Sequence, residues 1–97
     1  MPKAYAIGQF DIHDPASYTQ YRANTPATIE KYAGKFLVRG GKVEPLEGQP
    51  PAPRIVVVEF PSLEQARAWY SSAEYQQLLP IRQAAAEGSF FFVEGAD

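Results

Sequence analysis

Cysteine is absent from this chain of 97 residues, and histidine, methionine and tryptophan each occur once. The lack of cysteine excludes disulfide frameworks, thiolate zinc sites, iron–sulfur clusters and cysteine nucleophiles. No apolar run approaches the roughly 18 residues that a membrane-spanning helix needs. The sequence Met1-Pro2-Lys3 leads into a patterned strand rather than into the apolar core of a signal peptide. We therefore expect a soluble, cytoplasmic protein.

An excess of charge of either sign is also missing. Nine Lys and Arg residues stand against eleven Asp and Glu residues, and the resulting net charge of −2 is not typical of a protein that binds nucleic acid or an anionic membrane. Apolar residues, by contrast, are plentiful: the chain is 45% hydrophobic and 13% aromatic. That content lets a chain of this length bury a core, so we expect a single folded domain over residues 1–97.

The hydrophobic pattern predicts four strands. Alternating apolar residues, or clusters of β-branched and aromatic residues, indicate strands at residues 3–13, 35–39, 54–60 and 90–94. Helical patterns separate the first strand from the second and the third from the fourth, so the element order is β-α-β-β-α-β. With right-handed crossovers this order predicts an α+β, ferredoxin-like fold, in which four antiparallel strands carry both helices on one face.

Capping residues mark the helical regions. Asp14-Pro15 predicts the start of the first helix, because the Asp carboxylate accepts a free N–H and Pro has none to lose. Ser62 and Ser71 each begin a capping box in the second region. We expect Pro26 to kink or restart the first helix, with Thr25 as a new N-cap. Gly34 and Gly88 are expected to end the two helical regions.

A proline-rich stretch separates the second and third strands. Residues 44–53 contain four Pro and one Gly, which predicts an exposed connecting loop. Gly40-Gly41, just before this loop, predicts a β-bulge or a close approach of another part of the chain.

Two helices can cover only one face of the predicted sheet. If the small residues at positions 4, 6 and 8 pack against the helices, the other face carries Tyr5, Ile7, Leu37, Ile55 and Val57. An exposed apolar surface of this kind usually marks an interface. We therefore predict a homodimer in which two sheets face each other. A monomer with a loop laid over the sheet is the alternative.

Several blocks along the chain resemble one known family. These blocks are Gly34-Lys-Phe-Leu-Val-Arg39-Gly-Gly41, Leu46-Glu-Gly48, Val58-Glu-Phe-Pro-Ser62, Trp69-Tyr70, Ser72-Ala-Glu-Tyr75, Arg82 and Val93-Glu-Gly95. Together they resemble the family called Domain of Unknown Function 1330, which is similar to the dimeric α/β-barrel superfamily. That superfamily includes small monooxygenases, lactone isomerases and haem-handling enzymes. The resemblance implies the fold and the dimer, and it supplies no catalytic residues.

Three polar residues are candidates for a ligand site. Arg39 and Glu59 lie on strands that the proline-rich loop joins, so we expect them to be cross-strand neighbours on the same face as Gln9. A guanidinium, a carboxylate and an amide in a sheet-lined cleft would orient a small polar ligand, with Glu59 as candidate general base and Arg39 as its candidate catalytic partner. The structural alternative is an ion pair that fixes the strand register or crosses the dimer interface.

The helical regions supply further candidates. By their spacing most of the aromatic residues on the helices belong to the core. Trp69 and Tyr70 are adjacent in sequence, so both cannot face inward, and one of them could line a pocket mouth with Asn24 and Arg82. His13 lies close to two Asp residues in the sequence, but a single His is weak evidence for a metal site. We interpret this segment as the end of a strand that leads into a helix N-cap.

Two functions fit these observations. The first is a homodimer that binds a small organic molecule in a sheet-lined cleft, either as a binding protein or as an enzyme that needs neither cofactor nor metal. The second is a non-catalytic dimeric module whose open face serves only assembly. A cavity beside the sheet favours the first, and an interface filled by side chains favours the second.

Overall fold

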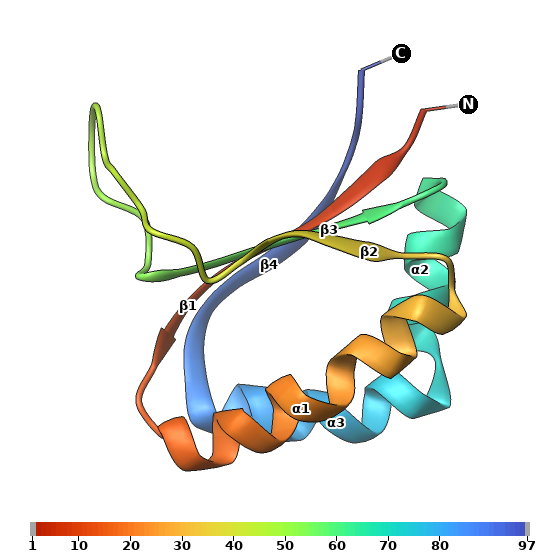
Figure 1. Cartoon of the computed structure of the whole chain (residues 1–97), viewed down its shortest axis with the longest axis horizontal. Coiled ribbons are helices and arrows are strands. Elements are labelled where there is room, and N and C mark those ends of the chain that lie inside the picture. Colours follow the sequence, from red (N-terminus) through yellow and green to blue (C-terminus); the bar gives the residue numbers. More distant parts are fainter. Residues whose placement is uncertain (1, 97) are drawn as a thin grey trace.

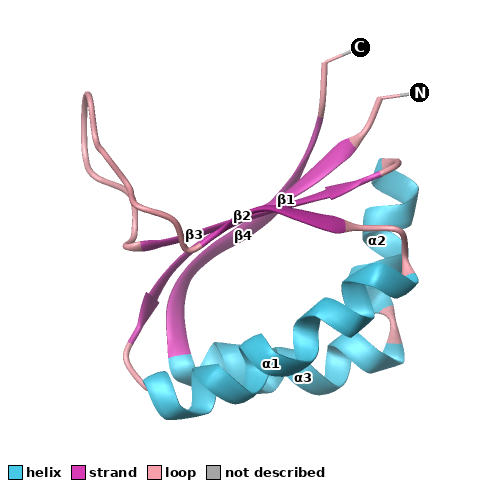
Figure 2. Cartoon of the chain, in the orientation of Figure 1, coloured by secondary structure: helices cyan, strands magenta, loops and turns pink. Residues whose placement is uncertain are grey.

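A four-stranded antiparallel sheet with the order β2-β3-β1-β4 forms one layer of the protein in a computed structural model that describes residues 2–96. The elements are β1 (Ala4–Ile12), α1 (Pro15–Lys31), β2 (Lys35–Arg39), β3 (Arg54–Phe60), α2 (Leu63–Ser71), α3 (Ala73–Ala85) and β4 (Ala86–Glu94). The three helices lie on one side of the sheet, and the loop of residues 40–53 projects on the other (Figure 1). Figure 2 shows the same two layers coloured by secondary structure. The predicted ferredoxin-like fold is confirmed.

The core fills the space between the sheet and the helices. Along β1 the alternate residues Ala4, Ala6, Gly8 and Phe10 are buried, and the residues at 5, 7 and 9 lie on the other face. The small side chains let the aromatic residues of the helices approach the sheet. Trp69 of α2 packs on Phe60 and on Tyr75 of α3, with ring centroids 5.4 and 4.2 Å apart. Burying aromatic rings of this size is a large part of what stabilises a domain this small.

Side-chain caps begin all three helices. The Asp14 carboxylate accepts the Ser17 backbone N–H at 3.2 Å, and the Ser62 hydroxyl accepts that of Gln65 at 3.1 Å, as predicted. The third cap is Ser72, whose hydroxyl accepts the backbone N–H of Tyr75 at 3.2 Å. The prediction placed this cap one residue too early, at Ser71.

Pro26 does not restart the first helix. The prediction of a new N-cap at Thr25 is wrong, because α1 runs unbroken from residue 15 to 31. Thr25 lies inside the helix, and its hydroxyl donates to the carbonyl of Tyr21 at 2.6 Å. Pro26 has no N–H to give the carbonyl four residues earlier, which is that of Arg22. A side chain from the sheet satisfies this carbonyl instead, as described below.

Neither predicted glycine stop ends its helix. The left-handed residue after α1 is Ala33, at φ 62°, and Gly34 is needed for packing, because a Cβ there would lie 2.6 Å from the Phe60 ring. α3 passes directly into β4, which begins at residue 86. Gly88 therefore lies inside β4, at φ 154°, where a Cβ would lie 1.8 Å from the carbonyl oxygen of Gln9. Both glycines permit a close approach of other atoms.

The face of the sheet opposite the helices carries an apolar row that crosses all four strands. In the strand register this row runs Val38, Val57, Ile7, Phe91. Phe91 at 46% and Val38 at 38% are among the most exposed large apolar residues in the protein. The predicted apolar open face is present. Within residues 2–96, no helix is both long enough and apolar enough to cross a membrane.

Candidate functional site

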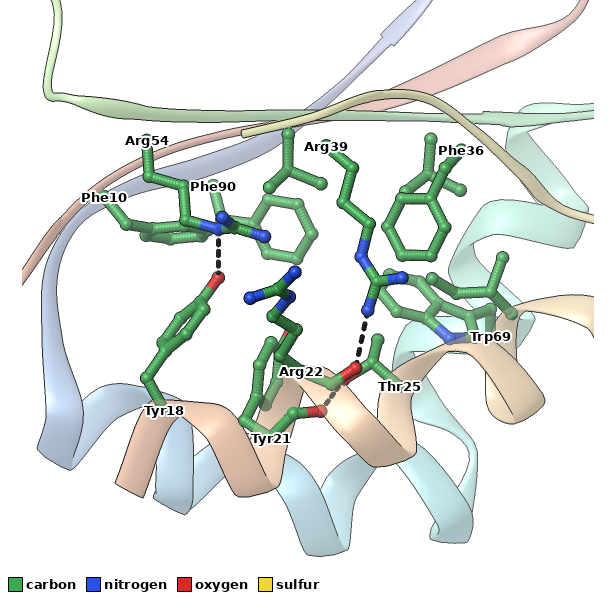
Figure 3. A pocket seen from close by; sticks show the side chains of 13 residues that line it. Phe10, Tyr18, Tyr21, Arg22, Thr25, Phe36, Arg39, Arg54, Trp69 and Phe90 are labelled. Carbon is green, nitrogen blue, oxygen red and sulfur yellow. Dashed lines mark hydrogen bonds between the residues drawn. The ribbon is translucent and has the colours of Figure 1, made fainter. Parts of the chain in front are cut away.

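A cleft lies between the sheet and helix α1 (Figure 3). Its volume amounts to about 380 Å³ with the open mouth included, and the side chains leave room inside for little more than one water molecule. The cleft is therefore narrow, and any larger molecule must displace side chains to enter it. The residues that line it are Phe10, Tyr18, Tyr21, Arg22, Thr25, Ile29, Phe36, Arg39, Arg54, Val56, Val58, Trp69 and Phe90.

Three arginines from three different elements point into this cleft. Arg22 rises from α1, Arg39 descends from the end of β2, and Arg54 descends from the start of β3 (Figure 3). The Nη2 of Arg39 donates to the backbone carbonyl of Arg22 at 2.6 Å, and the Nε of Arg54 donates to the hydroxyl of Tyr18 at 3.1 Å. Arg39 also lies over the ring of Phe36, 4.6 Å from its centroid.

A β-bulge turns Arg39 toward the cleft. The pairing of β2 with β3 shifts between Phe36 and Val38, so that Val38 pairs with Val57 and Arg39 with Val56. One extra residue reverses the faces of all residues that follow it. Without the bulge, Arg39 would share the open face with Lys35. The bulge therefore lies a few residues before Gly40-Gly41, and at Gly40 the alternative prediction, a close approach, is found, because a Cβ there would collide with the Arg54 guanidinium.

Among residues 2–96, the three guanidinium groups of the cleft have no negatively charged partner. Burial lowers the pKa of Arg39, and the nearby charges of Arg22 and Arg54 lower it further. Among residues 2–96 the ion pairs are those of Lys3 and Lys35 with Glu59 and of Lys31 with Glu74. None of them includes a cleft arginine, so no carboxylate of the described residues neutralises the positive charge in the cleft.

Aromatic side chains form the inner wall of the cleft. The indole N–H of Trp69 donates to the hydroxyl of Thr28 at 3.0 Å, which fixes the ring in its buried position. The hydroxyls of Tyr21 and Tyr75 share a hydrogen bond of 2.9 Å. Burial raises the pKa of Tyr21, so its phenol stays protonated at neutral pH. The wall is therefore apolar, with a few neutral hydroxyls.

Comparison with known families identifies the chain. The model of the family described as a domain of unknown function, DUF1330, matches residues 3–96. The chain belongs to the DUF1330 family. No curated protein is similar enough in sequence to count as a match.

Solved structures share the fold of this DUF1330 chain. A protein of unknown function from Rhodopseudomonas palustris superposes with a TM-score of 0.80 at 14% identity, covering 99% of this chain and 84% of that one. SnoaB, a cofactor-independent oxygenase from Streptomyces nogalater, has a TM-score of 0.68 at 11% identity, covering 100% of this chain and 96% of that one. A dimeric protein of unknown function and ferredoxin-like fold from Bacteroides fragilis has a TM-score of 0.55 at 14% identity, with 96% of each chain covered. At these identities the likeness shows the fold alone.

The predicted trio of Gln9, Arg39 and Glu59 is not brought together in this DUF1330 chain. Gln9 and Glu59 lie on the open face, whereas the bulge turns Arg39 to the helix side. Glu59 interacts instead with Lys3 and Lys35, at 3.5 and 3.4 Å. The expected contact between Arg39 and Glu59 within one chain, as a site or as an ion pair that fixes the strand register, is therefore wrong. Gln9 accepts the backbone N–H of Ala52 at 3.3 Å and holds the base of the proline-rich loop.

The other predicted site residues are not brought together in one site either. Trp69 lines the cleft, whereas Tyr70 borders a second, more open hollow beside β4. Asn24 lies on the exposed side of α1, and its side-chain amide donates to the Gln20 carbonyl. Arg82 is buried behind the cleft, over the rings of Phe10 and Phe90, which line it.

Sequence reasoning missed the other two arginines of the cleft, although the sequence carries a signal for each. Arg22 follows the buried Tyr18 by four residues and precedes the buried Thr25 by three, so it borders the inward stripe of α1. Arg54 is two residues before Val56 and four before Val58, so it lies on the same face of β3 as these buried residues.

Proposed function

We propose that this DUF1330 protein is a homodimer that binds a small organic molecule in the cleft between its sheet and α1. The observation that carries the proposal is the cleft itself, an apolar and aromatic wall with polar groups at its mouth, which is the usual make-up of a ligand site. Arg22 is exposed and has a long side chain, so it can move aside to admit a molecule larger than water. Binding therefore requires side-chain movement and no change of fold.

The chemistry of the cleft favours binding over base catalysis. Among residues 2–96, no Asp, Glu or His lines it, so no carboxylate or imidazole is in place to remove a proton from a bound molecule. The likeness to the oxygenase SnoaB supports a scaffold that suits small organic molecules. An enzyme built on this cleft would depend on the reactivity of its substrate, with Tyr21 and the arginines as hydrogen-bond donors.

The apolar open face supports the dimer. The residues Val38, Val57, Ile7 and Phe91 form a continuous apolar row across the sheet, and an apolar surface of this kind commonly marks a protein–protein interface. The loop of residues 40–53 projects on the same side, where it can reach around a second copy (Figure 1). The fold neighbour from Bacteroides fragilis is described as dimeric. The two clefts of such a dimer lie on its outer, helix-covered sides.

Sedimentation velocity tests the dimer. We expect the wild-type protein to sediment at twice its chain mass of 10.8 kDa. Phe91→Glu places a charge at the β4 end of the apolar row and is expected to give a folded monomer. Arg67→Glu, an exposed charge change on α2, is the matched control and should remain a dimer. A wild-type monomer contradicts the proposed assembly.

Nuclear magnetic resonance tests the binding. The chain has one tryptophan, so the indole N–H of Trp69 gives a single signal that reports on the cleft wall. We expect this signal to move when a library of small aromatic compounds is added, and to move less for compounds without a ring. If the protein is a dimer and no compound moves the signal, the alternative function holds, and the open face serves assembly alone.

A further inference from the structure

We propose that the natural ligand of the cleft is a small aromatic carboxylate, whose anionic group binds among Arg22, Arg39 and Arg54 and whose ring packs on the inner wall. This inference rests on the proposed function and deepens it by naming the ligand class. Two independent features of the cleft carry it: the charge at the mouth and the aromatic surface behind it (Figure 3).

The charge at the mouth points to an anion. Three arginines from α1, β2 and β3 converge where no carboxylate of residues 2–96 pairs with them, although the chain as a whole has a net charge of −2. Like charges held this close repel one another, and an acidic chain has enough carboxylates to neutralise them. A cleft lined by one sign of charge attracts ligands of the opposite sign. The cluster is therefore best explained by an anion that neutralises it on binding.

Arg82 adds to this positive charge from behind the wall. It is 7% exposed, and its guanidinium lies 4.9 and 5.1 Å from the ring centroids of Phe10 and Phe90. Its Nε donates to the hydroxyl of Tyr75 at 3.4 Å, and no ion pair of residues 2–96 includes it. A buried arginine is ordinarily paired with a carboxylate. Here it raises the positive potential of the cleft instead.

The donors at the mouth suit a flat, two-oxygen anion. Arg39 is held in place by its bond to the Arg22 carbonyl, and Arg54 by its bond to the Tyr18 hydroxyl. A guanidinium has five N–H donors in a fixed fork that matches a carboxylate, so both retain donors for a ligand. Fixing these side chains before binding lowers the entropy cost of holding the anion.

The inner wall calls for an apolar ring rather than for a bare inorganic anion. Behind the arginines lie Phe10, Phe90 and Trp69, together with the aliphatic side chains of Val56 and Ile29. Inorganic phosphate would pair with the arginines and leave this surface without a partner. An aromatic acid contacts both parts, and ring-to-ring packing adds to the area that it buries.

Binding of cinnamate and of its neutral amide, cinnamamide, tests the inference. The two probes share one ring and one shape and differ in charge. The signal of the Trp69 indole N–H reports on both, and each dissociation constant is read from its titration. We expect cinnamate to bind at least about tenfold more tightly than cinnamamide, because charge-assisted hydrogen bonds contribute that much or more.

Arginine variants assign the effect to the cleft. Arg39→Gln and, separately, Arg54→Gln should each weaken cinnamate binding about tenfold and change cinnamamide binding less than about twofold. Arg67→Gln, which removes an exposed arginine on α2, is the matched control and should change neither. The pair of cleft variants keeps the test available if one of them fails to fold.

Each of the remaining results of these titrations would contradict a particular part of the proposal. Equal binding of the acid and the amide leaves the proposed binding function standing and overturns the anionic ligand class. A signal that neither probe moves overturns both. If inorganic phosphate alone binds as tightly as cinnamate, the aromatic part of the inference is wrong, and the cleft holds a small oxyanion.

Discussion

The guanidinium of Arg39 donates a hydrogen bond to the backbone carbonyl of Arg22, 2.6 Å away, and so ties the edge strand β2 to helix α1. This carbonyl would ordinarily accept the N–H of the residue four positions later, but that residue is Pro26. The proline thus frees an acceptor at the mouth of the cleft, and the bulge in β2 turns Arg39 to reach it. A helix irregularity and a strand irregularity together position one side chain.

Replacing Pro26 by Ala tests this relationship. The new N–H competes with Arg39 for the Arg22 carbonyl and completes the helix, so we expect the protein to be more stable by about 1 kcal/mol or more. The Arg39 side chain should become more mobile, which relaxation of its Nε–H signal measures. Pro80→Ala in α3 is the matched control, because it also removes a proline from inside a helix but should leave Arg39 unchanged. A loss of stability in Pro26→Ala contradicts the account.

Thr28→Val removes the hydroxyl that accepts the Trp69 indole N–H and keeps the shape of the side chain. Both residues are buried, so the indole donor is left without a partner, and we expect a loss of about 1 to 3 kcal/mol in urea unfolding. Thr19→Val changes an exposed hydroxyl on the same helix and should alter stability by less than about 0.5 kcal/mol. Equal effects of the two changes would show that the bond to Trp69 contributes nothing.

Gly88→Ala is expected to be far more damaging than Gly41→Ala. A Cβ at position 88 would lie 1.8 Å from the Gln9 carbonyl oxygen at φ +154°, and backbone atoms cannot move aside as a flexible side chain can. A Cβ at position 41 meets nothing within 4 Å. We expect Gly88→Ala to cost about 3 kcal/mol or more and Gly41→Ala less than about 1 kcal/mol in thermal unfolding. Similar melting temperatures of the two variants would contradict the described pairing of β4 with β1.

Glu59→Gln should remove part of the dependence of stability on acid pH. Burial raises the pKa of Glu59, but Lys3 and Lys35 lower it more, so its pKa lies below the ordinary value of 4.5. The carboxylate therefore stabilises the protein above about pH 4.5, and this contribution is lost as the pH falls through the lower, folded-state pKa.

Urea unfolding from neutral pH down to about pH 3 measures this dependence. The wild type should exceed Glu59→Gln in stability at neutral pH, and the difference should shrink as the solution becomes acidic. Glu30→Gln, an exposed change on α1, is the control. A difference that stays constant over the whole range would mean that the lysines do not act on Glu59.

The fold could be predicted from the sequence because its signals are local and agree with one another. The Asp14 and Ser62 caps, the alternation along β1 and the β-branched run of β3 each specify one element, and their order leaves few topologies. The predictions that Gly34 and Gly88 end helices were wrong. Glycine permits both a left-handed turn at a helix end and a close approach of other atoms, and the sequence does not distinguish the two. At Gly34 and Gly88 the close approach decides.

The site could be predicted only in part. Arg39 and Trp69 both line the cleft, and their role in binding a ligand stays a prediction. The pairing of Arg39 with Glu59 assumed an unbroken strand. A bulge at Leu37 reverses the faces of the residues that follow it, and nothing in the residues around it marks its position. The convergence of Arg22 with Arg54 depends on how α1 lies across the sheet, which is a tertiary relationship that periodicity does not encode.

Native mass spectrometry of the protein mixed with cinnamate is the most direct test of whether a dimer binds an aromatic acid, because one spectrum reports both assembly and binding. We predict a species of twice 10.8 kDa that gains one cinnamate per chain and releases it on denaturation, with the gain much reduced in Arg39→Gln. A monomer, or a dimer whose mass never increases at cinnamate concentrations far above those of the protein, would contradict this prediction.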